Sequence, residues 1–419
     1  MKINAISSLL LLLILIINLP GCRKIDEEVR NPEKEVLNFT VTEAQREFIN
    51  KSRGDTFEVT NPVPVLQFAG RTFTIDRFEI RGESSLNFER KGFGVNMGNK
   101  LTLTNPFEKT ERRYEEFKLV AMVFDYTYME HSIATALLRE VNLWPVYSFF
   151  TEVKLNNHTQ GLYLFIEDPV EYFIEQKNSS FVLRRGYNHS VRAYYSGPDK
   201  VDPQIYLSRF KKIYSDIVSY SGQQLYDTLS TRLDLEQYFA KLGIDLLLKN
   251  GDCTDELFLY SKIRNNKEIF GFFPWDFDDL FSDLPHEIGR SWAIGTVFGK
   301  RSYSGMNAVI ADVGSKLLFS IEDDLDYKIA KDNILYQKYL ITLRTVIEKI
   351  DQSTIDKIFD YTFEHISPFY SNDSIIILSK FDANATNYDL FVNNLAKKRQ
   401  LLKDRRNWIL QEINAQQKK

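Results

Sequence analysis

Short apolar runs alternate with polar residues between residues 57 and 103. Three of these runs are Val63–Phe68, Thr72–Ile75 and Phe78–Ile80, and glycines and turn-forming residues separate them. Runs of this length, rich in β-branched and aromatic side chains, are typical of strands, because such side chains pack well on a pleated surface. The pattern therefore predicts an antiparallel sheet in this part of the chain.

Apolar residues recur at helical spacing in three later segments. These segments are Met129–Val141, Leu235–Leu248 and Phe391–Ile413. Residues three or four positions apart share one face of a helix, so each segment is predicted to form an amphipathic helix. Asp234 precedes the second segment and is a candidate N-cap, because its carboxylate can accept hydrogen bonds from the first backbone N–H groups.

Two pairs of apolar runs are joined by short polar segments that favour turns. The pairs are Phe149–Leu155 with Leu162–Ile166, and Leu257–Ile263 with Ile269–Phe273. Asn and Gly in the connecting segments favour the turns of β-hairpins. Together with the helices, the hairpins predict an α+β fold, with a sheet-rich N-terminal lobe at about residues 57–190 and a helical C-terminal lobe at about residues 191–419.

The first 21 residues have the pattern of a bacterial secretion signal. A basic start precedes an apolar run at residues 9–17, which is shorter than the about 20 residues that a membrane-spanning helix needs. The string Leu-Pro-Gly-Cys at residues 19–22 resembles a lipobox, in which the cysteine is lipidated. We expect cleavage before Cys22, a charged tether at residues 22–38, and a lipid anchor that holds the protein to a membrane of the cell envelope, on its periplasmic or surface face. The alternative is a chance cysteine after an ordinary signal peptide.

Composition limits the classes of function. Hydrophobic residues make up 43% of the 419 residues and aromatic residues 14%, which is enough for a large core. The net charge is −4, so no basic field predicts nucleic-acid binding. Only Cys253 remains once Cys22 carries lipid, so no intrachain disulfide is expected in the mature chain. We expect Cys253 to be a small buried apolar group.

Two acidic strings follow strongly apolar segments. The first is Asn-Gly-Asp-Cys-Thr-Asp-Glu at residues 250–256, and the second is Pro-Trp-Asp-Phe-Asp-Asp at residues 274–279. The hairpin between them would return Asp276 close to Asp252. Carboxylates that converge from two loops are what a magnesium or calcium site requires. The competing interpretation is structural, with Asp252 capping a helix and residues 276–279 forming a turn.

The histidines offer no comparable signal. His131, His189, His286 and His365 show no recognisable metal-binding spacing, so the sequence assigns them no role. His158 lies in a polar connecting segment and is expected to be a turn residue.

Several motifs, in this order, resemble the spore-coat protein H (CotH-type) family of atypical protein kinases. They are Arg-Gly-Glu-Ser-Ser at residues 81–85, the basic pair Arg90-Lys91 before Phe93, Gly-Leu-Tyr at residues 161–163 before Glu167, Asp252, and the acidic string at residues 274–278. The resemblance extends from about Asn61 to Phe281.

The resemblance implies a much altered protein-kinase fold over residues 39–419 and transfer of the γ-phosphoryl group of ATP to Ser or Thr of a protein. It implies that Asp252 orients or deprotonates the acceptor hydroxyl and that Asp276 holds magnesium or manganese, with Glu256 and Asp278 as further candidate ligands. The chain contains no Gly-x-Gly-x-x-Gly loop, no His-Arg-Asp and no Asp-Phe-Gly. Phosphoryl transfer nevertheless needs mainly positioning, metal and a cation on the phosphates.

The chain departs from the commoner family pattern just after Asp252. Many relatives have an Asn that helps to bind metal there, whereas this chain offers Asp255-Glu256. Glu256 can still supply oxygen ligands, but its added charge leaves the number and affinity of the metal ions open.

The resemblance also supplies candidate nucleotide-binding residues. Lys91, or Arg90 beside it, matches the position expected to contact phosphates, and we favour Lys91 as a compact point charge. The alternative for both is a solvated surface pair. Glu167 is expected to pair with that cation or to line the nucleotide pocket, and Arg81 is a further candidate. Both are equally open to a structural interpretation.

From these residues we expect an exported kinase that acts on a protein of the cell surface or periplasm, with no nucleic-acid partner. One alternative is a non-catalytic lipoprotein that keeps the kinase-like fold, because function does not follow from fold. Another is a calcium-stabilised module that binds carbohydrate or protein.

Overall fold

The computed structural model describes residues 36–418 apart from 106–109, 126, 187–188, 198–201, 286–297, 299–315 and 379–385. The expected signal peptide, Cys22 and most of the expected tether lie outside the described residues, as does His286. Within the described ranges, no helix combines the length and the apolar character needed to cross a membrane.

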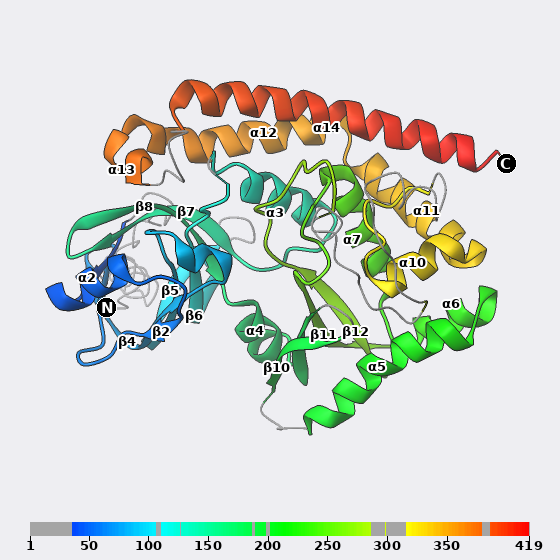
Figure 1. Ribbon diagram of the computed structural model, residues 1–419, viewed down its shortest axis with the longest axis horizontal. Helices are drawn as coiled ribbons and strands as arrows, with labels where there is room; N and C mark the ends of the chain where they lie inside the picture. Colours follow the sequence, from blue (N-terminus) through cyan, green and yellow to red (C-terminus); the bar gives the residue numbers. More distant parts are fainter. Residues whose placement is uncertain are drawn as a thin grey trace, which may run out of the picture.

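Much of the N-terminal part is one curved sheet that closes on itself (Figure 1). Its strands among the described residues are β1 (Leu37–Thr40), β2 (Phe57–Glu58), β3 (Val65–Phe68), β4 (Arg71–Arg81), β5 (Gly92–Asn105), β6 (Thr110–Val120), β7 (Ser148–Leu155) and β8 (His158–Glu167). Their order is β2-β4-β3-β1-β7-β8-β6-β5, and closure comes from an additional pairing of β4 with β5. The antiparallel sheet expected over residues 57–103 is confirmed as one part of this larger sheet.

Two long, irregular strands make the closure. The register shifts between Ile75 and Arg77 where β4 meets β5, and between Asn96 and Leu101 where β5 meets β6. Such irregularities bend a strand and increase its twist, which a sheet needs in order to curve back on itself.

One strand is shared by two hydrophobic cores. Tyr163 and Phe165 of β8 pack inside the closed sheet, whereas Leu162, Leu164 and Ile166 pack in the core of the helical part. Side chains along a strand point alternately to opposite faces, so β8 can be apolar on both. The two parts of the molecule therefore have separate cores on either side of β8.

The C-terminal part combines a second sheet with helices. This sheet has the order β10-β9-β11-β12 and consists of β9 (Phe181–Arg185), β10 (Val191–Ser196), β11 (Leu257–Arg264) and β12 (Lys267–Pro274). The α-helices in the described ranges are α2 (Glu43–Lys51), α3 (Glu130–Glu140), α4 (Pro169–Glu171), α5 (Pro203–Ser219), α6 (Gly222–Ser230), α7 (Leu235–Leu248), α10 (Asp324–Lys331), α11 (Asn333–Lys349), α12 (Gln352–Ile366), α13 (Asp373–Leu378) and α14 (Tyr388–Gln416). There are also two short 3₁₀ helices, η2 (Ser84–Asn87) and η4 (Ser367–Ser371), and a short π-helix, η3 (Tyr172–Gln176), in the described ranges.

The expected α+β class is confirmed, with a sheet-rich N-terminal region and a helical C-terminal region. The three expected amphipathic helices are α3, α7 and the central part of α14, and Asp234 caps α7 by accepting a hydrogen bond from the backbone N–H of Gln237. Both expected hairpins form, as β7–β8 and β11–β12. Figure 1 shows α14 and α12 running side by side along one edge of the molecule.

Candidate active site

The open end of the β11–β12 hairpin returns the second acidic string to the first. The backbone N–H of Gly251 donates to the carbonyl oxygen of Asp279 at 2.8 Å, and the N–H of Phe281 donates to that of Leu248, also at 2.8 Å. A Cβ on residue 251 would lie 1.9 Å from Oδ2 of Asp279 and 3.0 Å from Cβ of Ser282, so any other residue would displace the Asp279 side chain. The loop after α7 and the loop after β12 are thus held side by side.

Carboxylates converge where these loops meet. One oxygen from each of Asp252, Asp255 and Glu256 lies within 4.8 Å of the others. Burial raises the pKa of Glu256 well above its usual value, and the negative charges of Asp276, Asp255 and Asp252 raise it further, although Arg184 opposes them. The charge of Asp276 therefore acts on the first loop, as the hairpin predicts.

This acidic cluster fits a divalent cation. Oε2 of Glu256 is buried and accepts no hydrogen bond from a described residue. A buried carboxylate oxygen without a donor is costly unless a cation approaches it, and oxygen-only ligand sets suit magnesium, manganese or calcium.

Asp276 has an unusual backbone that a buried histidine supports. Its φ is 50°, in the left-handed region that few residues other than glycine adopt. Nε2 of His131 lies 3.2 Å from Oδ1 of Asp276, and Nδ1 of His131 lies 3.7 Å from Oδ2 of Asp125. Burial alone would lower the pKa of His131, but the two carboxylates outweigh it and raise this pKa to about 10. The ring is therefore a cation at neutral pH.

Asp278 and Glu130 extend the acidic region toward the long C-terminal helix. Burial raises the pKa of Asp278 well above its usual value, and Asp276 raises it further. Burial also raises the pKa of Glu130 to about 7, although Nζ of Lys398 lies 2.7 Å from its Oε1. Oε2 of Glu130 accepts a hydrogen bond from the N–H of Leu280 at 3.1 Å, which ties α3 to the second loop.

Two buried cationic side chains, Lys241 and Arg185, hold the backbone of the first loop through hydrogen bonds to its carbonyl oxygens. Nζ of Lys241 donates to the carbonyl oxygen of Cys253 at 2.9 Å, and Nε of Arg185 donates to that of Thr254 at 2.6 Å. Lys241 is itself ion-paired with Asp245 at 2.7 Å. Cys253 is buried, as expected, and burial raises the pKa of its thiol, so it is not a reactive thiolate.

Two arginines of the second sheet contact the acidic cluster directly. Arg184 of β9 is ion-paired with Glu256, and Arg192 of β10 is ion-paired with Asp255. Arg192 also pairs with Glu83, in the loop that follows β4 of the closed sheet. These contacts place guanidinium groups beside the carboxylates.

The basic pair Arg90-Lys91 is buried rather than solvated, so the solvated-pair alternative is wrong. Nζ of Lys91 donates to the carbonyl oxygens of Leu86 at 2.6 Å and Phe88 at 2.5 Å, and burial lowers the pKa of this ammonium to about 8. Arg90 donates to the carbonyl oxygens of Gln160 and Leu162. These contacts secure η2 and β8, and phosphate binding by Lys91 or Arg90 stays a prediction.

Glu167 and Arg81 occupy the ends of β8 and β4. Glu167 is fully buried and ion-paired with Arg112 at 2.9 Å, so its expected pairing with Lys91 is wrong. Arg81 is half-buried. Burial opposes ionisation of Asp168, but the charges of Lys118 and Arg81 outweigh it and hold the pKa of Asp168 below its usual value. A role for Glu167 or Arg81 in nucleotide binding stays a prediction.

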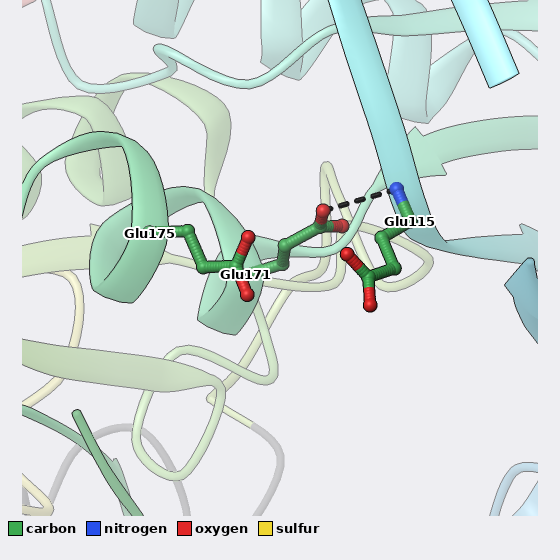
Figure 2. Close-up of side chains that lie close together, drawn as sticks. All are labelled: Glu115, Glu171 and Glu175. Atoms are coloured by element: carbon green, nitrogen blue, oxygen red, sulfur yellow. Dashed lines mark hydrogen bonds between the residues drawn. The ribbon is translucent and has the colours of Figure 1, made fainter. Parts of the chain in front are cut away.

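A second acidic cluster differs in its neighbours. Figure 2 shows Glu115, Glu171 and Glu175 close together, with the carboxylate of Glu171 turned toward the backbone N–H of Glu115. Burial raises the pKa of Glu171 to about 8. Lys100 already lies 2.5 Å from Glu115 and 3.8 Å from Glu175. Both carboxylate oxygens of Glu171 already accept backbone N–H groups, from Glu115 and Glu116, and Glu175 is exposed, so this cluster is the weaker candidate for a metal.

A hollow of about 460 Å³ lies away from the acidic loops. Tyr226, Arg264 and Lys267 are among its lining residues, so it sits at the turn of the β11–β12 hairpin, opposite the open end that carries Asp276. Its lining contains none of the clustered carboxylates described above.

Sequence reasoning missed three residues of the site: His131, Arg184 and Arg192. The spacing of His131 in the sequence does not match a metal site, and in the structure its partners are carboxylates rather than a metal. Arg184 and Arg185 stand together in an apolar strand, and buried guanidinium groups are costly unless paired. That cost was the available signal that carboxylates lay opposite.

A comparison with models of protein families agrees with the resemblance seen in the sequence. The family model described as CotH kinase protein matches residues 78–409, which is more than half of the chain and includes both acidic loops. No curated protein matches the chain.

Proposed function

Because the chain belongs to the CotH kinase protein family, we propose that it is an atypical protein kinase, transferring a phosphoryl group from a nucleotide to a Ser or Thr hydroxyl of a protein. The observation that carries the proposal is the cluster of Asp252, Asp255 and Glu256 in the loop after α7, on which the charge of Asp276 from the loop after β12 also acts. Phosphoryl transfer needs a divalent cation, cations on the phosphates and a residue that orients the hydroxyl, and this region offers candidates for each.

The proposed metal ligands are Asp276, Glu256 and Asp278. Magnesium or manganese held there would neutralise charge on the phosphates of ATP. The raised pKa values of Glu256 and Asp278 support this assignment, because carboxylates crowded in a buried site repel one another until a cation joins them.

Asp252 is the proposed residue that orients or deprotonates the acceptor hydroxyl. It precedes the segment whose carbonyl groups Lys241 and Arg185 hold, so its backbone has little freedom. A carboxylate at a fixed position is suited to accept a proton from a hydroxyl within hydrogen-bonding reach.

We further propose that the closed sheet and the helical part correspond to the two lobes of a diverged kinase fold. The separate cores on either side of β8 support two structural units. The nucleotide would then contact both units, since Arg192 already links the loop after β4 to the acidic cluster.

The proposed setting is the cell envelope. The apolar run at residues 9–17 and the Leu-Pro-Gly-Cys string at residues 19–22 support export and lipidation of Cys22. The substrate would then be a protein of the surface or periplasm. Intact mass of the membrane-extracted protein tests this, with loss of the first 21 residues plus added lipid as the expected result.

Binding and transfer assays on Asp276→Ala and Asp252→Ala test the kinase proposal. Asp276→Ala should abolish metal-dependent nucleotide binding. Asp252→Ala should retain binding while transfer falls by about 10²–10⁴-fold, as for a lost general base. The measurements are calorimetric titration with metal and nucleotide and a labelled-phosphate transfer assay. Asp227→Asn, in an exposed position on α6, is the matched control and should change neither.

Two results would count against the kinase proposal. Unchanged nucleotide binding by Asp276→Ala would remove the metal site from the mechanism. Nucleotide binding without transfer by the unmodified protein, across the nucleotides, metals and protein substrates tried, would favour the non-catalytic lipoprotein.

A further inference from the structure

We propose that Arg184 and Arg192 bind the phosphate groups of the nucleotide, exchanging their present carboxylate partners for phosphate oxygens when a divalent cation enters the acidic cluster. The inference rests on the proposed function. It assigns the phosphate contacts to cations of β9 and β10, a role that the sequence motif alone suggests for Lys91.

Strand geometry directs Arg184 toward the cluster. Neighbouring residues of a strand point to opposite faces. Arg185 enters the helical core, where it donates to the hydroxyl of Tyr238 at 3.0 Å, so Arg184 faces the other way and pairs with Glu256. The side chain of Arg184 remains 18% exposed, and its Nε is buried and donates no hydrogen bond to a described residue, so the guanidinium keeps an unused donor.

A bulge and a glycine direct Arg192 to the same place. The register of β9 and β10 shifts at Arg192, and such an irregularity re-aims the side chain that it carries. A Cβ on Gly186 would lie 2.8 Å from Cγ of Arg192, so the glycine makes room for the arginine stem. The guanidinium of Arg192 then meets Asp255 from one side and Glu83 from the other.

The chemistry of the two pairs allows an exchange. A guanidinium group is a planar fork that matches carboxylate and phosphate oxygens equally well. Without ligand, Arg184 and Arg192 offset part of the charge on Glu256 and Asp255. A divalent cation on these carboxylates would offset that charge instead and would free both guanidinium groups to face the phosphates.

Lys91 is poorly placed for the same exchange. Its ammonium donates to two backbone carbonyl groups, at Leu86 and Phe88. A cation bound by the cluster cannot replace those donors, so moving Lys91 to a phosphate would leave buried carbonyl groups without partners. The arginine pairs carry no such cost once the metal is bound.

The exchange predicts that removing either arginine strengthens the binding of Mn²⁺ alone and weakens the binding of Mn²⁺ with nucleotide. In Arg184→Gln and Arg192→Gln, Mn²⁺ alone should bind more tightly, on the order of threefold to tenfold, because a competing positive charge is gone. Mn²⁺ together with a non-hydrolysable ATP analogue should bind about tenfold to a hundredfold more weakly, because a charge-assisted hydrogen bond to phosphate is lost. Calorimetric titration of each folded variant measures both affinities.

Matched variants separate this inference from general damage. Arg209→Gln removes an arginine ion-paired with Glu268 on β12, away from the cluster, and should change neither affinity. Arg184→Lys and Arg192→Lys keep the charge, so Mn²⁺ alone should bind as in the unmodified protein while the nucleotide binds more weakly, because the fork is lost. These lysine variants serve as the test if the glutamine variants do not fold.

The outcomes distinguish the two proposals. If the unmodified protein binds the nucleotide analogue with Mn²⁺ and every arginine variant binds it equally well, the arginine assignment is wrong and the proposed function stands. If both affinities fall together in the variants, the arginines are structural and the assignment is again wrong. If the unmodified protein binds Mn²⁺ but no nucleotide, the proposed function fails, and the arginine assignment fails with it.

Discussion

Among single residues, His131 brings a buried positive charge to the acidic loops. It is 2% exposed, and two carboxylates hold its pKa at about 10, so a buried cation sits beside Asp276. Ring contact with Phe277, whose centroid lies 6.3 Å away, further fixes its orientation. Asp276 therefore has one oxygen near an imidazolium, and its second oxygen is left for another partner.

Replacing His131 should destabilise the protein in a way that divalent cations partly reverse. His131→Gln leaves the carboxylates of Asp125 and Asp276 without their cation, which costs about 1–3 kcal/mol, because Asp125 is buried whereas the side chain of Asp276 is 35% exposed and screened by solvent. Mn²⁺ should recover part of this loss, because it neutralises Asp276. Thermal unfolding with and without Mn²⁺ measures both effects.

His189 provides the comparison. Its Nε2 lies 2.7 Å from Oδ2 of Asp324, which is not part of the acidic cluster. His189→Gln should lower stability by the same amount with or without Mn²⁺. An equal loss for His131→Gln in the two conditions would contradict the link between His131 and a cation site.

At the scale of secondary-structure elements, two hairpins determine which loops meet. Both turn through Asn-Asn pairs, at residues 156–157 and 265–266, and all four residues have positive φ. Asn tolerates the left-handed region better than most residues, which suits tight hairpin turns. The second turn matters for the site because it sets the register that ends with Leu257 opposite Pro274, next to the acidic loops.

Changing the second turn should affect both stability and cation binding. Asn266→Val puts a β-branched side chain at a φ of 58° and should lower the free energy of unfolding by about 1–2 kcal/mol. Mn²⁺ affinity should fall as well, because the hairpin holds the loop that carries Asp276 against the loop that carries Asp252. Urea unfolding and Mn²⁺ titration are the measurements. Asn266→Gly, free of the steric conflict, should keep both values close to those of the unmodified protein.

At the scale of the whole molecule, the raised pKa values of buried carboxyl groups make the free energy of unfolding depend on pH. Burial and neighbouring carboxylates raise the pKa values of Glu256 and Asp278. The folded state therefore holds protons that the unfolded state releases above about pH 4, so these groups make the metal-free protein less stable as the pH rises toward their raised pKa values.

Divalent cations should reverse that trend. Metal binding requires deprotonated carboxylates, so the increase in melting temperature caused by Mn²⁺ should grow as the pH rises from about 4, the ordinary carboxyl pKa, into the neutral range. Asp278→Asn should reduce this growth, because it removes one of the titrating groups. A Mn²⁺ effect that is the same across this range would exclude Glu256 and Asp278 as ligands.

Local order along the chain was readable from the sequence. The alternation of apolar residues predicted strands over residues 57–103 but not β1 or β6, the helical spacing predicted α3, α7 and α14, and Asn-rich connections predicted both hairpins. These features depend on residues close together in the chain, and the order of the family motifs is likewise a property of the sequence itself. The hairpin even predicted that Asp252 and Asp276 would approach each other.

Only the tertiary structure decided which charges neutralise one another. His131 and Asp276 are separated by 145 positions, and Arg184 and Glu256 by 72. Lys91, the cation favoured from its motif, instead donates to carbonyl groups within five positions of itself. A side chain's electrostatic partner depends on distance and burial in the folded molecule, and neither local propensity nor motif spacing encodes those quantities when the partner lies on a different element.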